Sequence, residues 1–154
     1  MRTIDDWLNE YGESHKNKTN KLIHWICVPA IVFSILGLLY ALKLPFYIAG
    51  FQLNVGIIVS IIVLIYYFSL SPSLSVGMFF YLAVCMALAN LIEKSGILPL
   101  WLFSIAVFVL AWLGQFYGHK IEGKKPSFLK DIQFLMIGPA WLMNFIYKKI
   151  GVAL

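Results

Sequence analysis

The sequence contains three histidines, and all of them lie in two short polar stretches beside long apolar runs. His15 and His24 belong to YGESHKNKTNKLIH (residues 11–24), and His119 belongs to GQFYGHKIEGKKPSF (residues 114–128), which also carries Glu122. Imidazole and carboxylate groups together suit zinc or non-haem iron. Two histidines with one carboxylate form the facial arrangement of Fe(II) oxygenases, which leaves positions open for substrate and dioxygen. We therefore take His15, His24, His119 and Glu122 as candidate metal ligands and catalytic groups.

The composition of the chain indicates a membrane protein. Of its 154 residues 61% are hydrophobic and 12% are charged, with a mean hydropathy of +0.84. A soluble domain has about a quarter charged residues. No Asp, Glu, Lys or Arg occurs in residues 44–92, 95–119 or 132–147. This segregation excludes an ordinary globular core.

Four apolar segments are long enough to cross a bilayer as helices. Residues 44–92 as one helix would extend about 73 Å, more than twice the hydrocarbon thickness, so they must fold back. SLSPSLS, with Pro72 at its centre, is the expected turn. The predicted spans are residues 25–43, 53–71, 74–92 and 99–117. The shorter apolar segment 132–147 contains Gly138-Pro139 and is predicted to be re-entrant or interfacial.

The fold expected from this pattern is an all-α integral membrane protein forming a single membrane domain, residues 1–154. With four spans, all but two of the twelve basic residues lie on the side of both termini, while Lys43 and Lys94 lie opposite. The positive-inside rule then places both termini in the cytoplasm. The lysines flank spans and form no basic module, so attraction to anionic membrane lipid explains the net charge better than nucleic-acid binding.

The segment before the first span, residues 1–24, predicts an interfacial helix followed by a break. Ile4, Trp7, Leu8 and Tyr11 recur at helical spacing, and Thr3 begins the helix. His15 continues this apolar stripe, four residues beyond Tyr11. KNKTN then breaks the helix, and Thr19 or Asn20 is expected to cap the first span. His24 follows Asn20 by four residues, so the break allows the two histidines to converge.

The second stretch begins at the end of predicted span 99–117, continues into the cytoplasmic segment 118–131, and predicts one polar helical face at the same cytoplasmic depth. Gln115, His119 and Glu122 are spaced i, i+4 and i+7, and Gly123 followed by Pro126 predicts the helix end. Tyr11, Asn20 and Gln115 are candidates to orient the imidazoles. Each feature alone has a plainer explanation: an interfacial histidine commonly just forms hydrogen bonds, and Glu122 can pair with a neighbouring lysine. The position of all three histidines on one side favours a metal site.

The two stretches resemble the signature motifs of the DUF962, or Mpo1-like, family of membrane proteins. The first matches in Tyr11, His15, Asn20, His24 and Pro29, and IGPAWL near the C-terminus also matches. The second stretch matches in Gln115, Phe116, Gly118, His119, Glu122, Gly123 and Pro126, with Ser127 where alanine is common.

This resemblance implies an Fe(II)-dependent dioxygenase that removes one carbon from 2-hydroxy fatty acids, as in fatty acid alpha-oxidation. It implies an iron site built from His15, His24 and His119, with Glu122 as a further candidate. The expected substrates are a 2-hydroxy fatty acid and dioxygen, with the acyl chain in the bilayer. The membrane would be the inner membrane in a bacterium and the endoplasmic reticulum in a eukaryote.

Two other functions stay open from the residues. A zinc-dependent membrane hydrolase of lipid amides or esters would use the same histidines, with Glu122 as general base. A non-catalytic lipid-binding protein would use the histidines only to hydrogen-bond helix ends. The spans lack charged residues away from their ends, which argues against an ion or proton transporter.

Overall fold

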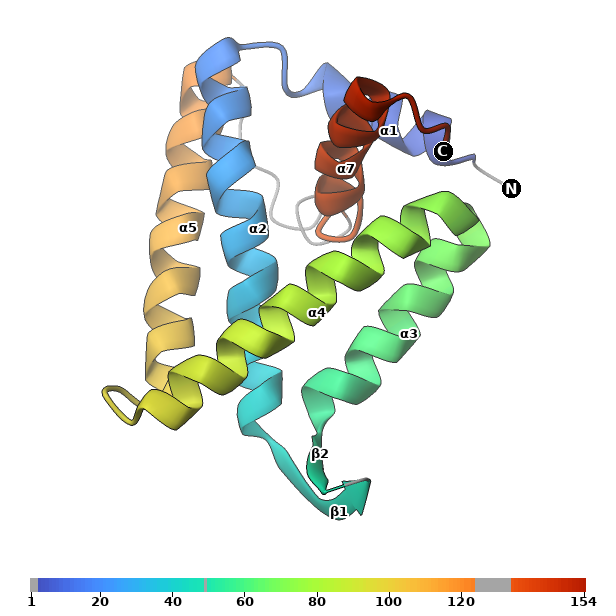
Figure 1. The fold of residues 1–154 in the computed structure, drawn as a ribbon. Helices are drawn as coiled ribbons and strands as arrows, with labels where there is room; N and C mark the ends of the chain where they lie inside the picture. The colour runs from blue at the N-terminus through green and yellow to red at the C-terminus, as the bar shows by residue number, and fades with distance from the viewer. Residues whose placement is uncertain (1–2, 49, 124–133) are drawn as a thin grey trace.

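The computed structural model describes residues 3–48, 50–123 and 134–154, which form six helices and one β-hairpin (Figure 1). The motif positions Pro126 and Ser127, and the start of segment 132–147, lie outside these residues. The elements are α1 (Ile4–Glu13), α2 (Lys18–Ala41), β1 (Lys43–Ile48), β2 (Phe51–Asn54), α3 (Val55–Leu70), α4 (Pro72–Ser95), α5 (Leu100–Glu122) and α7 (Ile137–Ile150).

The helices have the length and composition of a membrane protein. Within the described residues α2, α4 and α5 are long and apolar enough to cross a membrane. The helix in predicted span 53–71, α3, has 16 residues and a length of about 24 Å, short of a hydrocarbon core of about 30 Å. The helices α2, α3, α4 and α5 nevertheless alternate in direction along the chain (Figure 1). Four crossings therefore stay a prediction.

The linker between the first two predicted spans forms a β-hairpin, which the expected all-α fold did not include. Strands β1 and β2 pair antiparallel, with Ile48 opposite Phe51 and Tyr47 opposite Gln52. The segment is rich in aromatic and branched residues that favour strands. Gly50, with φ of 81°, supplies the positive backbone angle that so tight a reversal needs.

Capping residues set where the helices begin and end. Thr3 and Asp6 form the expected capping box of α1, and Gly123, with φ of 73°, ends α5. The first long helix begins earlier than predicted, because the side chain of Asn17 accepts hydrogen bonds from the backbone of Thr19 and Asn20. The expectation that Thr19 or Asn20 caps this helix was wrong.

The apolar stripe of α1 is buried against α7. Ile4, Leu8 and Tyr11 are buried in one cluster with Trp141 and Ala140 of α7. The segment predicted as re-entrant or interfacial thus supplies a helix that covers α1. The stripe is used for protein packing, which is a different role from the predicted membrane anchoring.

Small residues bring α2 and α5 into close antiparallel contact. A Cβ atom on Gly114 of α5 would lie 2.6 Å from Sγ of Cys27, and one on Gly37 of α2 would collide with Ser104. Close approach through small residues is a common way for membrane helices to associate. This contact sets the spacing of the two helix ends that carry His24 and His119.

Replacement of Gly114 by leucine is expected to force α2 and α5 apart. Overpacking of this kind costs roughly 1–3 kcal/mol, so the midpoint of thermal unfolding in detergent should fall. Ala106→Leu places the same side chain on an exposed position of the same helix and should leave the midpoint unchanged. Equal midpoints for the two variants would contradict the proposed role of the glycine.

Candidate metal centre

The structure brings the three histidines together from three separate segments. His15 follows the end of α1, His24 lies near the start of α2, and His119 lies near the end of α5. The ring centroids are 4.2 Å apart for His15 and His24, 5.1 Å for His24 and His119, and 5.5 Å for His15 and His119. The break between α1 and α2 allows this convergence, as predicted.

All three imidazoles are buried, and backbone carbonyls orient two of them. His15, His24 and His119 are 3%, 0% and 7% exposed. Nδ1 of His15 lies 2.6 Å from the carbonyl oxygen of Tyr11, and Nδ1 of His24 lies 2.9 Å from that of Asn20. A carbonyl oxygen can only accept, so Nδ1 carries the proton in both rings. Nε2 then bears the lone pair in each.

This donor set fits a divalent transition metal. One ligand atom from each histidine can be chosen so that all three lie within 4.8 Å of one another. The buried Nε2 of His24 has no hydrogen-bond partner among the described residues. Metal-binding histidines characteristically donate their second ring nitrogen to a carbonyl or carboxylate, as His15 and His24 do here. Three neutral imidazoles suit zinc or non-haem iron.

Glu122 lies at the end of α5 and holds the loop between α1 and α2. Its carboxylate accepts hydrogen bonds from the backbone N–H of Lys16 at 2.8 Å and of Asn17 at 3.0 Å, and from Nδ2 of Asn20 at 3.0 Å. Among the described residues the group with metal-ligand spacing consists of the three histidines, without Glu122. The carboxylate predicted as a ligand is thus engaged by the protein itself.

The same contacts stabilise the ionised form of Glu122, which lies beyond the predicted span 99–117. Partial burial raises the pKa of the Glu122 carboxyl, but the hydrogen bonds from Asn17, Lys16 and Asn20, together with nearby His15, lower that pKa to below its usual value. Glu122 is therefore an anion at neutral pH. It adds negative charge beside the imidazoles without entering their group.

Asn20 connects the glutamate to the histidines. The side chain of Asn20 is fully buried and donates to Glu122, while its backbone carbonyl accepts from His24. A Cβ atom on Gly118 would collide with Oδ1 of Asn20, so only glycine leaves room for the amide. The Gly118-His119 pair thus allows α5 to approach α2 where His119 joins His24.

The other two residues predicted to orient the imidazoles lie in the same region. The ring of Tyr11 stacks on that of His15, with centroids 4.2 Å apart and an interplanar angle of 13°. Gln115 is buried one helical turn before His119. The predicted spacing of Gln115 and His119 on one face of α5 is present.

An aromatic wall from the C-terminal part of the chain was missed by the sequence analysis. The indole of Trp141 lies 5.4 Å from the His15 ring, and both Trp141 and Phe134 lie 5.4 Å from the Tyr11 ring, between centroids. IGPAWL contains Trp141 and matched the family motif, so a signal existed. Nothing in the local pattern linked this residue to His15, which is more than a hundred positions away.

Comparisons with known proteins identify relatives of this chain. Residues 1–150 match the family described as "2-hydroxy-palmitic acid dioxygenase Mpo1-like". The chain is 28% identical over 147 residues to the 2-hydroxy-palmitic acid dioxygenase MPO1 of Saccharomyces cerevisiae. That alignment covers 92% of this chain and 78% of the yeast protein. No solved structure matches the chain.

The family match extends over nearly the whole sequence and includes all three histidine positions, Glu122 and Trp141. The chain therefore belongs to the Mpo1-like family.

Proposed function

We propose that this protein is an Fe(II)-dependent dioxygenase that shortens 2-hydroxy fatty acids by one carbon. His15, His24 and His119 would hold the iron, which when bound supplies a centre for activating dioxygen and chelating a 2-hydroxy acid. The balanced reaction converts one 2-hydroxy acid and one dioxygen into the acid shorter by one carbon, carbon dioxide and water.

The observation that carries this proposal is the orientation of the buried imidazoles. The carbonyl oxygens of Tyr11 and Asn20 fix the Nδ1–H tautomers of His15 and His24. Burying an imidazole without a partner for its second nitrogen is unfavourable. A metal would satisfy Nε2 of His24, which has no partner among the described residues.

The remaining residues of the site position the histidines and exclude water. Asn20 and Glu122 fasten the α1–α2 loop to the end of α5, while Tyr11 and Trp141 cover His15. With four crossings, both termini and this site lie at the cytoplasmic boundary of the inner membrane in a bacterium, or of the endoplasmic reticulum in a eukaryote. A fatty acid could then present its carboxylate to the site while its chain stays in lipid.

The engagement of Glu122 argues against a zinc hydrolase. That alternative needs Glu122 as a general base on a metal-bound water. The carboxylate instead accepts hydrogen bonds from two backbone N–H groups and from Asn20. We propose Glu122 as a positioning residue, a role that the dioxygenase accommodates.

Metal content and turnover test the proposed function together. Protein purified in detergent under anaerobic conditions should contain about one iron per chain, and His119→Ala should lose it. Lys120→Ala changes the next residue of α5, whose side chain is exposed, and should retain the iron. Wild-type protein given 2-hydroxypalmitate should consume one dioxygen for each pentadecanoate formed.

Other outcomes would select another function. Zinc at the same stoichiometry, without dioxygen consumption, would favour the hydrolase. Protein that carries neither metal would support the non-catalytic lipid-binding function and exclude the dioxygenase.

A second prediction concerns the role of Glu122. Glu122→Gln keeps the size but puts an amide donor opposite backbone N–H groups, so one or more of these contacts is lost. The expected result is about 1–3 kcal/mol less stability and about 10–100-fold weaker iron binding, measured by denaturant unfolding and by competition with a chelator. Asp5→Asn makes the same change on an exposed part of α1 and should alter neither quantity appreciably. Glu122→Gln with wild-type iron affinity would exclude the positioning role.

A further inference from the structure

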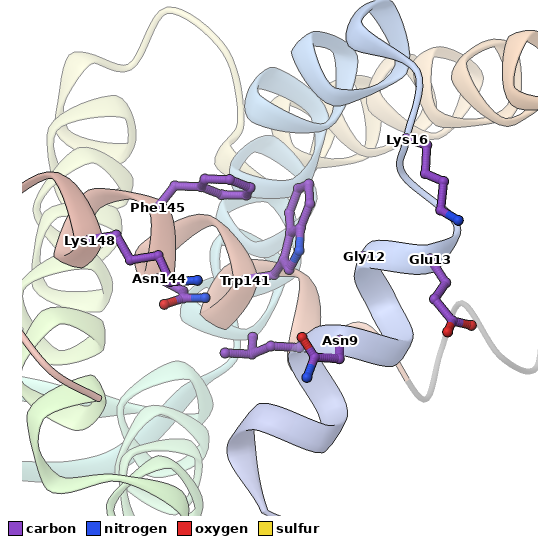
Figure 2. A pocket seen from close by; sticks show the side chains of 9 residues that line it. Asn9, Gly12, Glu13, Lys16, Trp141, Asn144, Phe145 and Lys148 are labelled. Carbon is purple, nitrogen blue, oxygen red and sulfur yellow. The ribbon is translucent and has the colours of Figure 1, made fainter.

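A groove of about 410 Å³ lies between α1 and α7, and the ring of Trp141 forms part of its wall (Figure 2). Leu8, Trp141 and Phe145 provide apolar walls. Lys16, Glu13 and Lys148 add charged groups, so the groove is amphipathic. Cavities of roughly 300–1,000 Å³ with apolar walls and a few polar groups are typical of small-molecule sites.

The charges of the groove favour an anion. Lys16 lies just beyond α1 and Lys148 lies on α7, so the two lysines stand at opposite sides of the groove, with the Lys16 side chain directed away from α7 (Figure 2). Glu13 contributes the opposing charge among the lining residues. In the described part of the chain neither lysine forms an ion pair, unlike Lys43, which binds Glu93 at 2.8 Å.

The groove shares a wall with the histidine site. Trp141 lines the groove, and its ring also lies 5.4 Å from the His15 ring, between centroids. Gly12 lines the groove as well, and a Cβ atom there would lie 3.4 Å from Nε1 of Trp141. One indole therefore separates the groove from the candidate metal ligands.

An apolar surface continues from the groove along α2. Phe145 lies 6.2 Å from Trp25, between ring centroids, and both rings are partly exposed. Leu22 and Ile26, on the same part of α2, are 63% and 67% exposed. A hydrocarbon chain that leaves the groove past Phe145 therefore meets the apolar surface of α2 around Leu22 and Ile26.

We propose that this groove is a binding site for the substrate acid before it reaches the histidines. The positive charges of Lys16 and Lys148 attract the carboxylate to the groove, and the chain passes over Phe145 and Trp25 into the bilayer. The identity of the ligand as a long-chain carboxylic acid rests on the proposed function. Lys16 and Lys148 help to bind the acid and take no part in the chemistry, because Trp141 stands between the groove and His15.

Photo-crosslinking with a diazirine derivative of palmitic acid tests this site. The probe lacks a 2-hydroxyl group, and labelling under nitrogen does not depend on turnover. Full-length protein in neutral detergent should be labelled on peptides of α1 and α7, and Lys16→Gln/Lys148→Gln should reduce this labelling about tenfold. Lys149→Gln removes the neighbouring charge outside the groove and should label like wild type. The arginine variants at positions 16 and 148 should restore labelling, because they restore the charges.

Competition experiments distinguish the carboxylate from other ligands. Unlabelled palmitate should displace the probe, whereas its methyl ester should not. Equal displacement by the ester, equal displacement by an anionic phospholipid, labelling confined to other helices, or a double variant that labels like wild type would each overturn the proposal. Iron content is measured on the same samples. Normal labelling without iron or turnover would contradict the proposed dioxygenase and leave the acid-binding groove in place.

Discussion

The close antiparallel contact of α2 and α5 is the constraint on which the candidate metal centre depends. Gly114 and Gly118 let α5 approach α2 where larger side chains would collide with Cys27 and Asn20. Two rings from helices far apart in sequence, His24 and His119, thereby come within 5.1 Å between centroids. The third histidine, His15, lies on neither helix, so a second contact must hold it close to the other two. Glu122 supplies it by accepting hydrogen bonds from the backbone that follows His15.

Burial of three imidazoles links metal binding to stability. Each buried polar ring loses contact with water, and hydrogen bonds to carbonyl oxygens recover part of that loss for His15 and His24. Three charged rings at this spacing would repel one another in a site with little water, which favours neutral imidazoles that can bind a metal. A metal that binds only the folded chain would stabilise it further. The same residues therefore determine both the chemistry and the local stability of this region.

The parts of the site that follow from local spacing were predictable, and the parts that follow from tertiary packing were not. The i, i+4 spacing of Asn20 and His24 correctly indicated a shared face because α2 fixes that relation. The same spacing also placed His15 beside Tyr11, although His15 lies just beyond the end of α1. Two partners of Glu122 are backbone groups of a distant loop, which leave no mark in the sequence. Trp141 reaches His15 only because α7 covers α1. The hairpin was missed because the expected fold was all-α, although the aromatic residues of this linker favour strands.

The central proposal is that His15, His24 and His119 converge on one Fe(II) ion while Glu122 stays outside its coordination shell. X-ray absorption spectroscopy at the iron edge, on anaerobically prepared protein, tests this claim most directly. For the wild type we expect the outer-shell scattering pattern of three imidazoles. His24→Ala, if it retains iron, should show two imidazoles. Glu122→Gln should keep the same set of ligands as the wild type. A spectrum with fewer than three imidazoles in the wild type, or loss of an oxygen ligand in Glu122→Gln, would contradict it.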